Sequence, residues 1–209
     1  MSEHSREDAY RLDSPAAHRA YYDTWAASYD DDFIGATGYA IPREVARAFM
    51  TWSTPADTPV AEIGCGTGQL GLALRHPALD GYDISAGMLA VAARTGTYRD
   101  LRSADLTDAD ATIEARYGGI VSSGTFTLGH LGPADLAGVL RLGLPGALCA
   151  IGINAAHYAD AGFDNALAGL VGQGRILRID QREVGSYAVS DIPDEPVNRT
   201  VIAVFRLTD

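Results

Sequence analysis

A glycine-rich segment limits the fold of this chain more than any other part of the sequence. It reads Glu-Ile-Gly-Cys-Gly-Thr-Gly-Gln-Leu-Gly over residues 62–71, between a short apolar run and a helical pattern. Glycines at this spacing let a strand turn sharply into a helix, and they let a ligand approach the backbone and the helix N-terminus. Asp83 ends the next apolar run, where a carboxylate can accept hydrogen bonds from ribose hydroxyls. The segment therefore predicts a ribose-containing ligand at the end of a strand.

The rest of the chain continues a strand–helix alternation. Apolar runs at 60–64, 78–83, 118–124 and 146–154, with a weaker one near 98–106, are separated by helical patterns. This alternation is typical of βαβ units on a parallel sheet. Two longer alternating strands, near 175–189 and 198–207, close the chain. We expect an α/β fold: a Rossmann-like, seven-stranded, mostly parallel sheet with an antiparallel last strand and helices on both faces.

The N-terminal quarter has a different pattern. Residues 1–15 are polar and predict a flexible arm, whereas residues 16–52 predict a helical cap. The core is expected over 58–209, so that 16–209 forms a single domain. Tyr21, Trp25 and Tyr29 are spaced at i, i+4 and i+8 with Tyr22 beside them, so these aromatic residues share roughly a 100° arc of the first cap helix at 3.6 residues per turn. This aromatic face is expected either to form a lid over the ligand or only to pack on the domain.

Two cofactors fit the glycine loop. Residues 66–71 match the dinucleotide pattern G-x-G-x-x-G, with Asp83 near the expected spacing. Three features favour S-adenosylmethionine instead. Glu62 precedes the loop, and its negative charge would not help to bind a pyrophosphate. The same charge would favour a ligand that carries an ammonium and a sulfonium group. A helical region precedes the first strand, and a further acid, Asp105, follows the third strand, where an adenine amino group could be held.

These segments resemble the motifs of class I S-adenosylmethionine-dependent methyltransferases. The resemblance rests on residues 62–71, 82–92, 103–106 and 144–148, and the cap at 21–33 is similar to that of many small-molecule members. The run at 122–133 resembles more narrowly the methyltransferase-like group named after the Williams–Beuren region. The resemblance covers roughly residues 18–207 and implies methyl transfer to a small-molecule acceptor on O, N or S.

The resemblance also implies roles for individual residues. The loop glycines would wrap the methionine part of S-adenosylmethionine, Asp83 would take the ribose hydroxyls, and Glu62 would orient the loop or the ammonium group. Side chains after the second strand would flank the adenine, and those after the third strand would contact its edge. Ser123 would lie beside the sulfonium. The implied cofactor-binding residues are Tyr22, Trp25, Tyr29, Glu62, Gly64, Gly66, Gly68, Asp83, Ile84, Met88, Asp105, Leu106 and Ser123. Several have simpler explanations: Asp83 as a helix cap, Met88 as helix core and Asp105 as a turn residue.

Methyl transfer is an in-line displacement, in which an enzyme mainly holds donor and nucleophile in line. A general base is needed only if the acceptor keeps its proton, and His130, in the loop after the fourth strand, is the candidate. A loop histidine that only bonds the backbone is the alternative. His157 and Tyr158 are weaker candidates, and His18 is expected to be peripheral.

Charge and composition exclude several other classes. Sixteen basic against 27 acidic residues give a net charge of −11, which disfavours nucleic acids and anionic membranes as partners. Every basic residue is arginine, so an oxidoreductase with a catalytic Tyr-x-x-x-Lys is impossible. Two separated cysteines and no long apolar segment predict no metal site and no membrane span. We expect a cytoplasmic, bacterial enzyme of unknown oligomeric state; the alternatives are an NAD-dependent oxidoreductase or a non-catalytic S-adenosylmethionine-binding protein.

Overall fold

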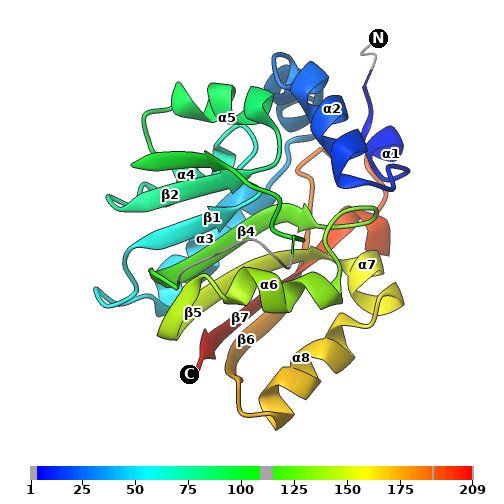
Figure 1. Ribbon diagram of the computed structural model, residues 1–209. Helices are drawn as coiled ribbons and strands as arrows, with labels where there is room; N and C mark the ends of the chain where they lie inside the picture. The colour runs from blue at the N-terminus through cyan, green and yellow to red at the C-terminus, as the bar shows by residue number, and fades with distance from the viewer. Residues whose placement is uncertain (1–3, 109–114, 190, 209) are drawn as a thin grey trace.

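The sheet of the computed structural model, which describes residues 4–108, 115–189 and 191–208, confirms the expected architecture. Its seven strands lie in the order β3-β2-β1-β4-β5-β7-β6 (Figure 1). β7 runs antiparallel to β5 and β6, and the remaining pairs are parallel. The strands are β1 (Val60–Ile63), β2 (Leu79–Asp83), β3 (Asp100–Ser103), β4 (Tyr117–Phe126), β5 (Gly143–Asn154), β6 (Ile176–Gly185) and β7 (Arg199–Leu207).

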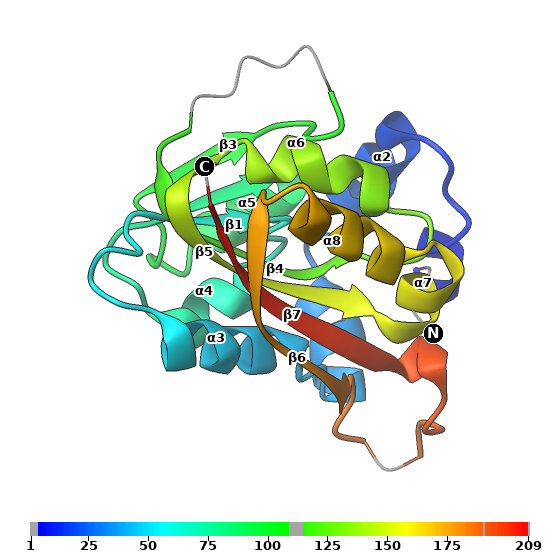
Figure 2. The same ribbon diagram turned by 90° about the horizontal axis from the view of Figure 1, so that it is seen from below.

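Helices cover both faces of this sheet, as Figure 2 shows from below. Side chains of α3 and α4 form one buried cluster with one face, and those of α6 and α8 form another with the opposite face. The helical segments are α1 (Arg6–Ala9), α2 (Pro15–Trp25), η1 (Asp30–Gly35), α3 (Ile41–Trp52), α4 (Gln69–Leu74), α5 (Ala86–Ala93), η2 (Pro133–Asp135), α6 (Leu136–Leu140), α7 (Ala155–Asp160), α8 (Phe163–Gly172) and η3 (Pro196–Asn198).

Helix α3, which was expected to belong to the cap, packs against the sheet. Ile41, Val45 and Phe49 are at most 1% exposed and pack in the same cluster as Val121 of β4. Their spacing of four residues places all three on one side of the helix. By contrast, α1, α2 and η1 contribute no residue to either buried cluster of the sheet faces.

The segment expected to be a flexible arm is folded against the domain over its described part. Ser5 caps α1 through its hydroxyl, and Ala9 is 1% exposed. Arg6 Nη1 donates to the Tyr187 hydroxyl at 2.7 Å and to Asn198 Oδ1 at 2.8 Å. These bonds connect the N-terminal segment to the connection between β6 and β7, almost the full length of the chain away.

The strand order places the candidate site. β1 pairs with β2 on one side and with β4 on the other, so the chain reverses its direction of winding between β1 and β4. Open α/β sheets bind ligands outside the carboxyl ends of the strands at such a switch point. The glycine loop follows β1 at this point, and α2 lies against α5 at the same end of the molecule (Figure 1).

Candidate functional site

A cavity of about 370 Å³ lies at the switch point. The carboxyl ends of β1, β2 and β4 and the segment that follows β3 contribute to its wall, and α2 covers it. Eleven of the residues singled out from the sequence line it, so segments far apart in the chain meet here as the motif spacing predicts. They are Tyr22, Tyr29, Gly64, Gly66, Asp83, Ile84, Met88, Asp105, Leu106, Ser123 and His130.

Trp25, Glu62 and Gly68 are absent from this lining. Trp25 is 2% exposed, and its Nε1 donates to Asp32 at 3.2 Å, so this side chain stabilises the cap by joining α2 to η1. Gly68 stands at the N-terminus of α4 with φ of +93°. Glu62 is 1% exposed and lies behind the loop. Binding roles for these three remain predictions, and their observed contacts are with the protein.

Gly64 is the glycine of the loop with the tightest surroundings. Its φ is +64°, a conformation in which side chains are disfavoured, and a Cβ there would lie 1.9 Å from Thr125 Oγ1. Thr125 in turn donates to the Ile63 carbonyl at 3.0 Å, which ties the end of β4 to the end of β1. The loop can therefore follow this path only because residue 64 has no side chain.

Glu62 supports the loop through a tyrosine that the sequence did not single out. The Tyr98 hydroxyl donates to Glu62 Oε2 at 2.8 Å. Burial raises the pKa of Glu62 to about 8, although this bond opposes the shift. Tyr98 also lies against Gly71, where a Cβ would come 2.5 Å from its hydroxyl. No motif marks Tyr98, because its role depends on packing between two segments.

Asp83 joins the glycine loop to the start of α5. Its carboxylate accepts from the Gly66 N–H at 2.8 Å and from the Ser85 N–H at 2.9 Å. Burial raises the pKa of Asp83, while these backbone bonds act in the opposite direction. The carboxylate thus lines the cavity and bonds the turn before α5, whereas the N-cap of α5 is Ser85, not Asp83 as the alternative explanation expected; the ribose role of Asp83 stays a prediction.

Helix α2 is fastened over the cavity by contacts that the sequence did not predict. Asp23 Oδ1 accepts from the Ser85 hydroxyl at 2.6 Å and from the Gly87 N–H at 2.8 Å. Arg19 Nε donates to the Ile84 carbonyl at 3.2 Å. A ligand held between Ile84 and the glycine loop would be covered by this helix.

Replacing Asp23 with alanine is expected to weaken ligand retention, because the lid would lose two bonds to the start of α5. The expected effect is a 3- to 10-fold faster dissociation of bound ligand, about 1 kcal/mol. Stopped-flow measurement of the dissociation rate checks this. The matched control is Asp31→Ala, since Asp31 is exposed and close to Asp23 in the chain. Equal rates for the two variants would contradict a fastening role.

His130 and Tyr22 form a hydrogen-bonded pair at the cavity wall. His130 Nδ1 donates to the Leu128 carbonyl at 2.9 Å, so its Nε2 accepts from the Tyr22 hydroxyl at 2.9 Å. Both ring nitrogens of the candidate base are therefore occupied, and His130 reaches a substrate proton only through Tyr22. His18, which we expected to be peripheral, also lines the cavity; its ring centroid is 4.3 Å from that of His130.

Burial lowers the pKa of His130 to about 4, below the usual value near 6.5 of an unfolded chain. Between these values the unfolded state binds a proton that the folded state rejects. The free energy of unfolding should therefore fall as pH drops from about 6.5 to 4, by at most about 3 kcal/mol from this group. Urea unfolding at pH 7 and pH 5 measures the decrease. His130→Gln should show a smaller decrease, and an unchanged one would contradict the assignment.

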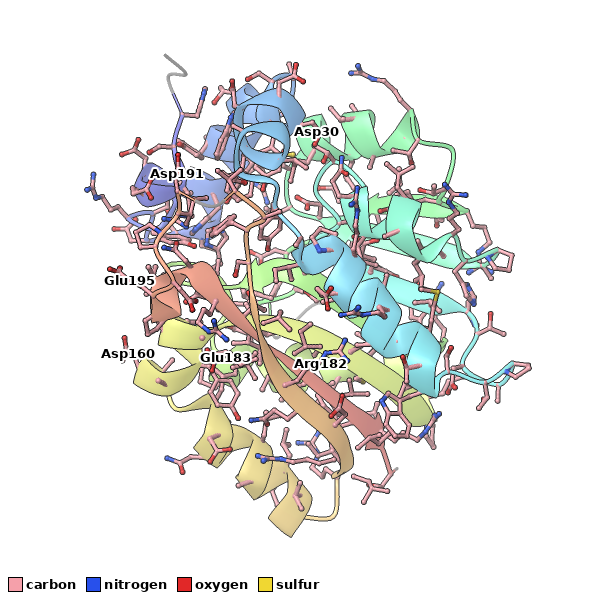
Figure 3. All side chains as sticks on the ribbon, turned by 180° about the vertical axis from the view of Figure 1, so that it is seen from behind. Asp30, Asp160, Arg182, Glu183, Asp191 and Glu195 are labelled. Atoms are coloured by element: carbon pink, nitrogen blue, oxygen red, sulfur yellow. The ribbon has the colours of Figure 1, made fainter. Side chains whose placement is uncertain are left out.

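Asp30 is a second unpredicted contact between the cap and the loop. It begins η1, at the position labelled in Figure 3, and its two carboxylate oxygens accept from Thr67 Oγ1 at 2.6 Å and Gln69 Nε2 at 3.0 Å. Gln69 is the first residue of α4. A carboxylate is favourable at a helix N-terminus, because the backbone N–H groups there give it a partial positive charge. Asp30 thus places negative charge where α4 begins.

No metal site accompanies this cavity in residues 4–108, 115–189 and 191–208, where no three His, Cys, Asp or Glu side chains are grouped to hold an ion. Both cysteines, Cys65 and Cys149, are free and buried. Among the helices of these residues, none combines the length and the hydropathy that a bilayer-spanning segment needs.

Solved structures share this architecture. Magnesium protoporphyrin IX methyltransferase (ChlM) from Synechocystis, with bound S-adenosylmethionine, superposes with a TM-score of 0.67 at 15% identity; 95% of this chain and 98% of that chain are covered. A TehB-like S-adenosylmethionine-dependent methyltransferase from Corynebacterium glutamicum gives 0.60 at 18% identity, with 90% and 99% covered. The N-methyltransferase NodS from Bradyrhizobium japonicum, in complex with S-adenosylhomocysteine, gives 0.59 at 13% identity, with 80% and 86% covered.

At these identities the likeness establishes the fold. The chain has the Rossmann-like fold of class I S-adenosylmethionine-dependent methyltransferases, as the sequence motifs predict. No family model matches the sequence. No curated protein matches it either. The narrower resemblance to the Williams–Beuren-region group stays a prediction.

Proposed function

We propose that this chain is an S-adenosylmethionine-dependent methyltransferase that acts on a small molecule. The observation that carries the choice of cofactor is Asp30 at the start of α4. A dinucleotide places its pyrophosphate at the N-terminus of the helix that follows the glycine loop. Here Asp30 bonds Thr67 and Gln69 at that position, so a pyrophosphate would meet a like charge. S-adenosylmethionine carries no phosphate and has two cationic groups, which suit an acidic site.

The residues on the cavity wall fit the parts of this cofactor. Asp83 would accept the ribose hydroxyls, and the backbone at Gly64 and Gly66 would follow the methionine part. The adenine would lie between Ile84 and Met88 on one side and Leu106 and Asp105 at its edge. Tyr22 and Tyr29 would cover the cofactor from the cap, with Ser123 near the sulfonium. Each of these residues lines the cavity.

The bound cofactor would supply an activated methyl carbon, so the protein has mainly to align an acceptor with it and to exclude water. The lid contacts of Asp23 and Arg19 serve the second task. The Tyr22 hydroxyl donates a hydrogen bond to His130 Nε2, which leaves the lone pairs of the hydroxyl oxygen available to accept from a group in the cavity. We propose that His130 acts through Tyr22, either orienting its hydroxyl or relaying a proton from the acceptor.

The experiment that tests this function is turnover. Purified protein would be incubated with S-adenosylmethionine and separate pools of phenols, amines and thiols, and S-adenosylhomocysteine would be measured by mass spectrometry. Acceptor-dependent product from at least one pool supports methyl transfer. Tight cofactor binding without product from any pool would favour a non-catalytic binding protein. Formation of NADH in a parallel incubation with NAD in place of S-adenosylmethionine would favour an oxidoreductase.

The remaining expectations belong to the same proposal. A net charge of −11 disfavours nucleic acid and anionic membrane surfaces as partners, so the acceptor is proposed to be a small molecule in the cytoplasm. One solved structure of this fold is a putative methyltransferase in complex with the Trm112 methyltransferase activator of Haloferax volcanii, with a TM-score of 0.62 at 15% identity.

A further inference from the structure

One buried nitrogen on the cavity wall has no partner. His18 is 8% exposed and lines the cavity, and its Nε2 is one of two buried side-chain polar atoms that lack a hydrogen bond among the described residues. The other, Arg182 Nε, belongs to β6 and not to the cavity lining. Buried polar groups are normally satisfied, so an unpartnered one on a cavity wall points to a polar group of a ligand.

The other ring nitrogen of His18 determines which kind of ligand group fits. Nδ1 lies 2.9 Å from the Ser14 carbonyl oxygen, and a carbonyl can only accept a hydrogen bond. In the neutral ring Nδ1 therefore carries the hydrogen, and Nε2 presents a lone pair. Ser14 is also the N-cap of α2, so the helix start fixes the carbonyl that holds this ring. The ligand group that meets Nε2 must donate a hydrogen bond.

His18 lies beside the two residues that the proposed function places near the acceptor. Tyr22 follows it by four residues in α2, so both side chains are on the same face of the helix. The His130 ring centroid is 4.3 Å from that of His18. The loop that carries His130 packs closely on the segment before α2, because a Cβ on Gly129 would lie 2.8 Å from the Tyr10 carbonyl oxygen. Two segments far apart in the chain therefore form one polar group on the cavity wall.

His18 is better placed than its neighbours to take a proton directly. Both ring nitrogens of His130 already have partners within the protein. Of the three acids that line the cavity, Asp83 accepts two backbone N–H groups and Asp105 accepts the N–H and the hydroxyl of the residue two positions on. The third, Asp13, is exposed. His18 Nε2 thus combines burial, a lone pair and an open partner position.

We infer that His18 is the general base of the methyl transfer and that the acceptor is a hydroxyl or an amine that brings its proton into the site. This inference rests on the proposed function. The acceptor's O or N would bond the methyl carbon as the carbon–sulfur bond breaks, and the electron pair of that bond would go to sulfur. The acceptor's proton would pass to His18 Nε2, and the imidazolium, still bonded to the Ser14 carbonyl, would later lose it to water. Tyr22 would then orient the nucleophile.

Nitrogen NMR of the histidine rings tests this inference without turnover. Protein with histidine labelled at its ring nitrogens would be titrated with S-adenosylhomocysteine and then with millimolar phenol, aniline or anisole, and His18→Asn would assign the signal. We expect His18 to carry its hydrogen on Nδ1, with an Nε2 signal that S-adenosylhomocysteine leaves unchanged. Phenol or aniline should shift this signal toward the hydrogen-bonded value, whereas anisole, which has no O–H, should not. A shift caused by S-adenosylhomocysteine itself, or none with phenol or aniline, would overturn the inference.

Turnover of a phenol or an amine separates a base from a structural residue. His18→Asn, whose amide can still donate to the Ser14 carbonyl, should lower kcat about 100-fold and leave the affinity for S-adenosylhomocysteine unchanged. It should also lack the parent's fall in kcat at acidic pH, where a histidine base becomes protonated. His18→Gln replaces it if the asparagine variant does not fold. His76→Asn is the matched control, since His76 bonds the Ala78 N–H and does not line the cavity.

The results distinguish the inference from the proposed function on which it rests. Parental kcat and pH profile in a folded His18→Asn variant would overturn the assignment of His18 alone. Binding of S-adenosylhomocysteine without any change at His18 on adding phenol or aniline would do the same. Failure of the protein to bind S-adenosylhomocysteine would instead reject the proposed function.

Discussion

Replacing Gly64 with alanine should both destabilise the fold and abolish cofactor binding. The new Cβ would lie 1.9 Å from Thr125 Oγ1, and Thr125 is held by its bond to the Ile63 carbonyl. The left-handed conformation at φ of +64° adds a further cost for any side chain. Overpacking and backbone strain together should lower the free energy of unfolding by about 3 kcal/mol. Urea unfolding and calorimetric titration with S-adenosylhomocysteine measure the two effects.

Gly96→Ala is the matched control for this prediction. Gly96 has φ of +65°, but a Cβ there meets no atom within 4 Å. In Gly96→Ala the free energy of unfolding should therefore fall only by the cost of the left-handed backbone conformation, about 1 kcal/mol, and ligand binding should be retained. The double variant Gly64→Ala/Thr125→Ala should recover part of the lost stability, because it removes the colliding hydroxyl. If Gly64→Ala were as stable as Gly96→Ala and still bound ligand, the claim that the close contact with Thr125 requires glycine at position 64 would be contradicted.

Asp83→Asn should reduce the affinities for S-adenosylmethionine and for S-adenosylhomocysteine equally. Each affinity should fall about 100-fold, which is about 3 kcal/mol of binding free energy. The carboxylate now accepts two backbone N–H groups, from Gly66 and Ser85. In asparagine, the side-chain NH2 group would face one of these backbone N–H groups, and two donors cannot bond each other. The amide would also bind ribose hydroxyls less well than the carboxylate. The loss should be equal for both ligands, because they share the ribose and differ only at sulfur.

The control for the change of charge is Asp31→Asn. Asp31 is an exposed residue of η1 that does not line the cavity, so this variant removes the same charge without changing the cavity wall. Its affinities should stay within about two-fold of the parent, as expected for a screened surface charge. Parental affinity in Asp83→Asn, with the fold intact by circular dichroism, would show that Asp83 does not hold the ribose.

The features that the sequence predicts best depend on local pattern. The glycine spacing and the acids at 83 and 105 predict a site at the strand ends, and all three segments meet at one cavity. Alternating apolar runs likewise predict the sheet, including the antiparallel β7. Helix α3 was expected in the cap, and its packing against the sheet could not be predicted, because an apolar helix face does not reveal which layer it packs against.

The features that the sequence did not predict depend on contacts between distant segments. Asp30 bonds Thr67 and Gln69, Asp23 bonds Ser85, and Tyr98 bonds Glu62; no spacing rule relates the members of these pairs. His18 was expected to be peripheral, since nothing local shows that α2 turns it toward His130. Arg6 and Tyr187 lie 181 positions apart and meet only in the folded chain.

Calorimetric titration of the purified protein with S-adenosylmethionine, S-adenosylhomocysteine and NAD, side by side, tests the central claim most directly. The account predicts micromolar binding of both sulfur nucleotides and no heat from NAD, since the Asp30 carboxylate bonds Thr67 and Gln69 at the start of α4 and would repel a pyrophosphate there. Binding of NAD without the sulfur nucleotides would contradict it and would identify the glycine loop as a dinucleotide site.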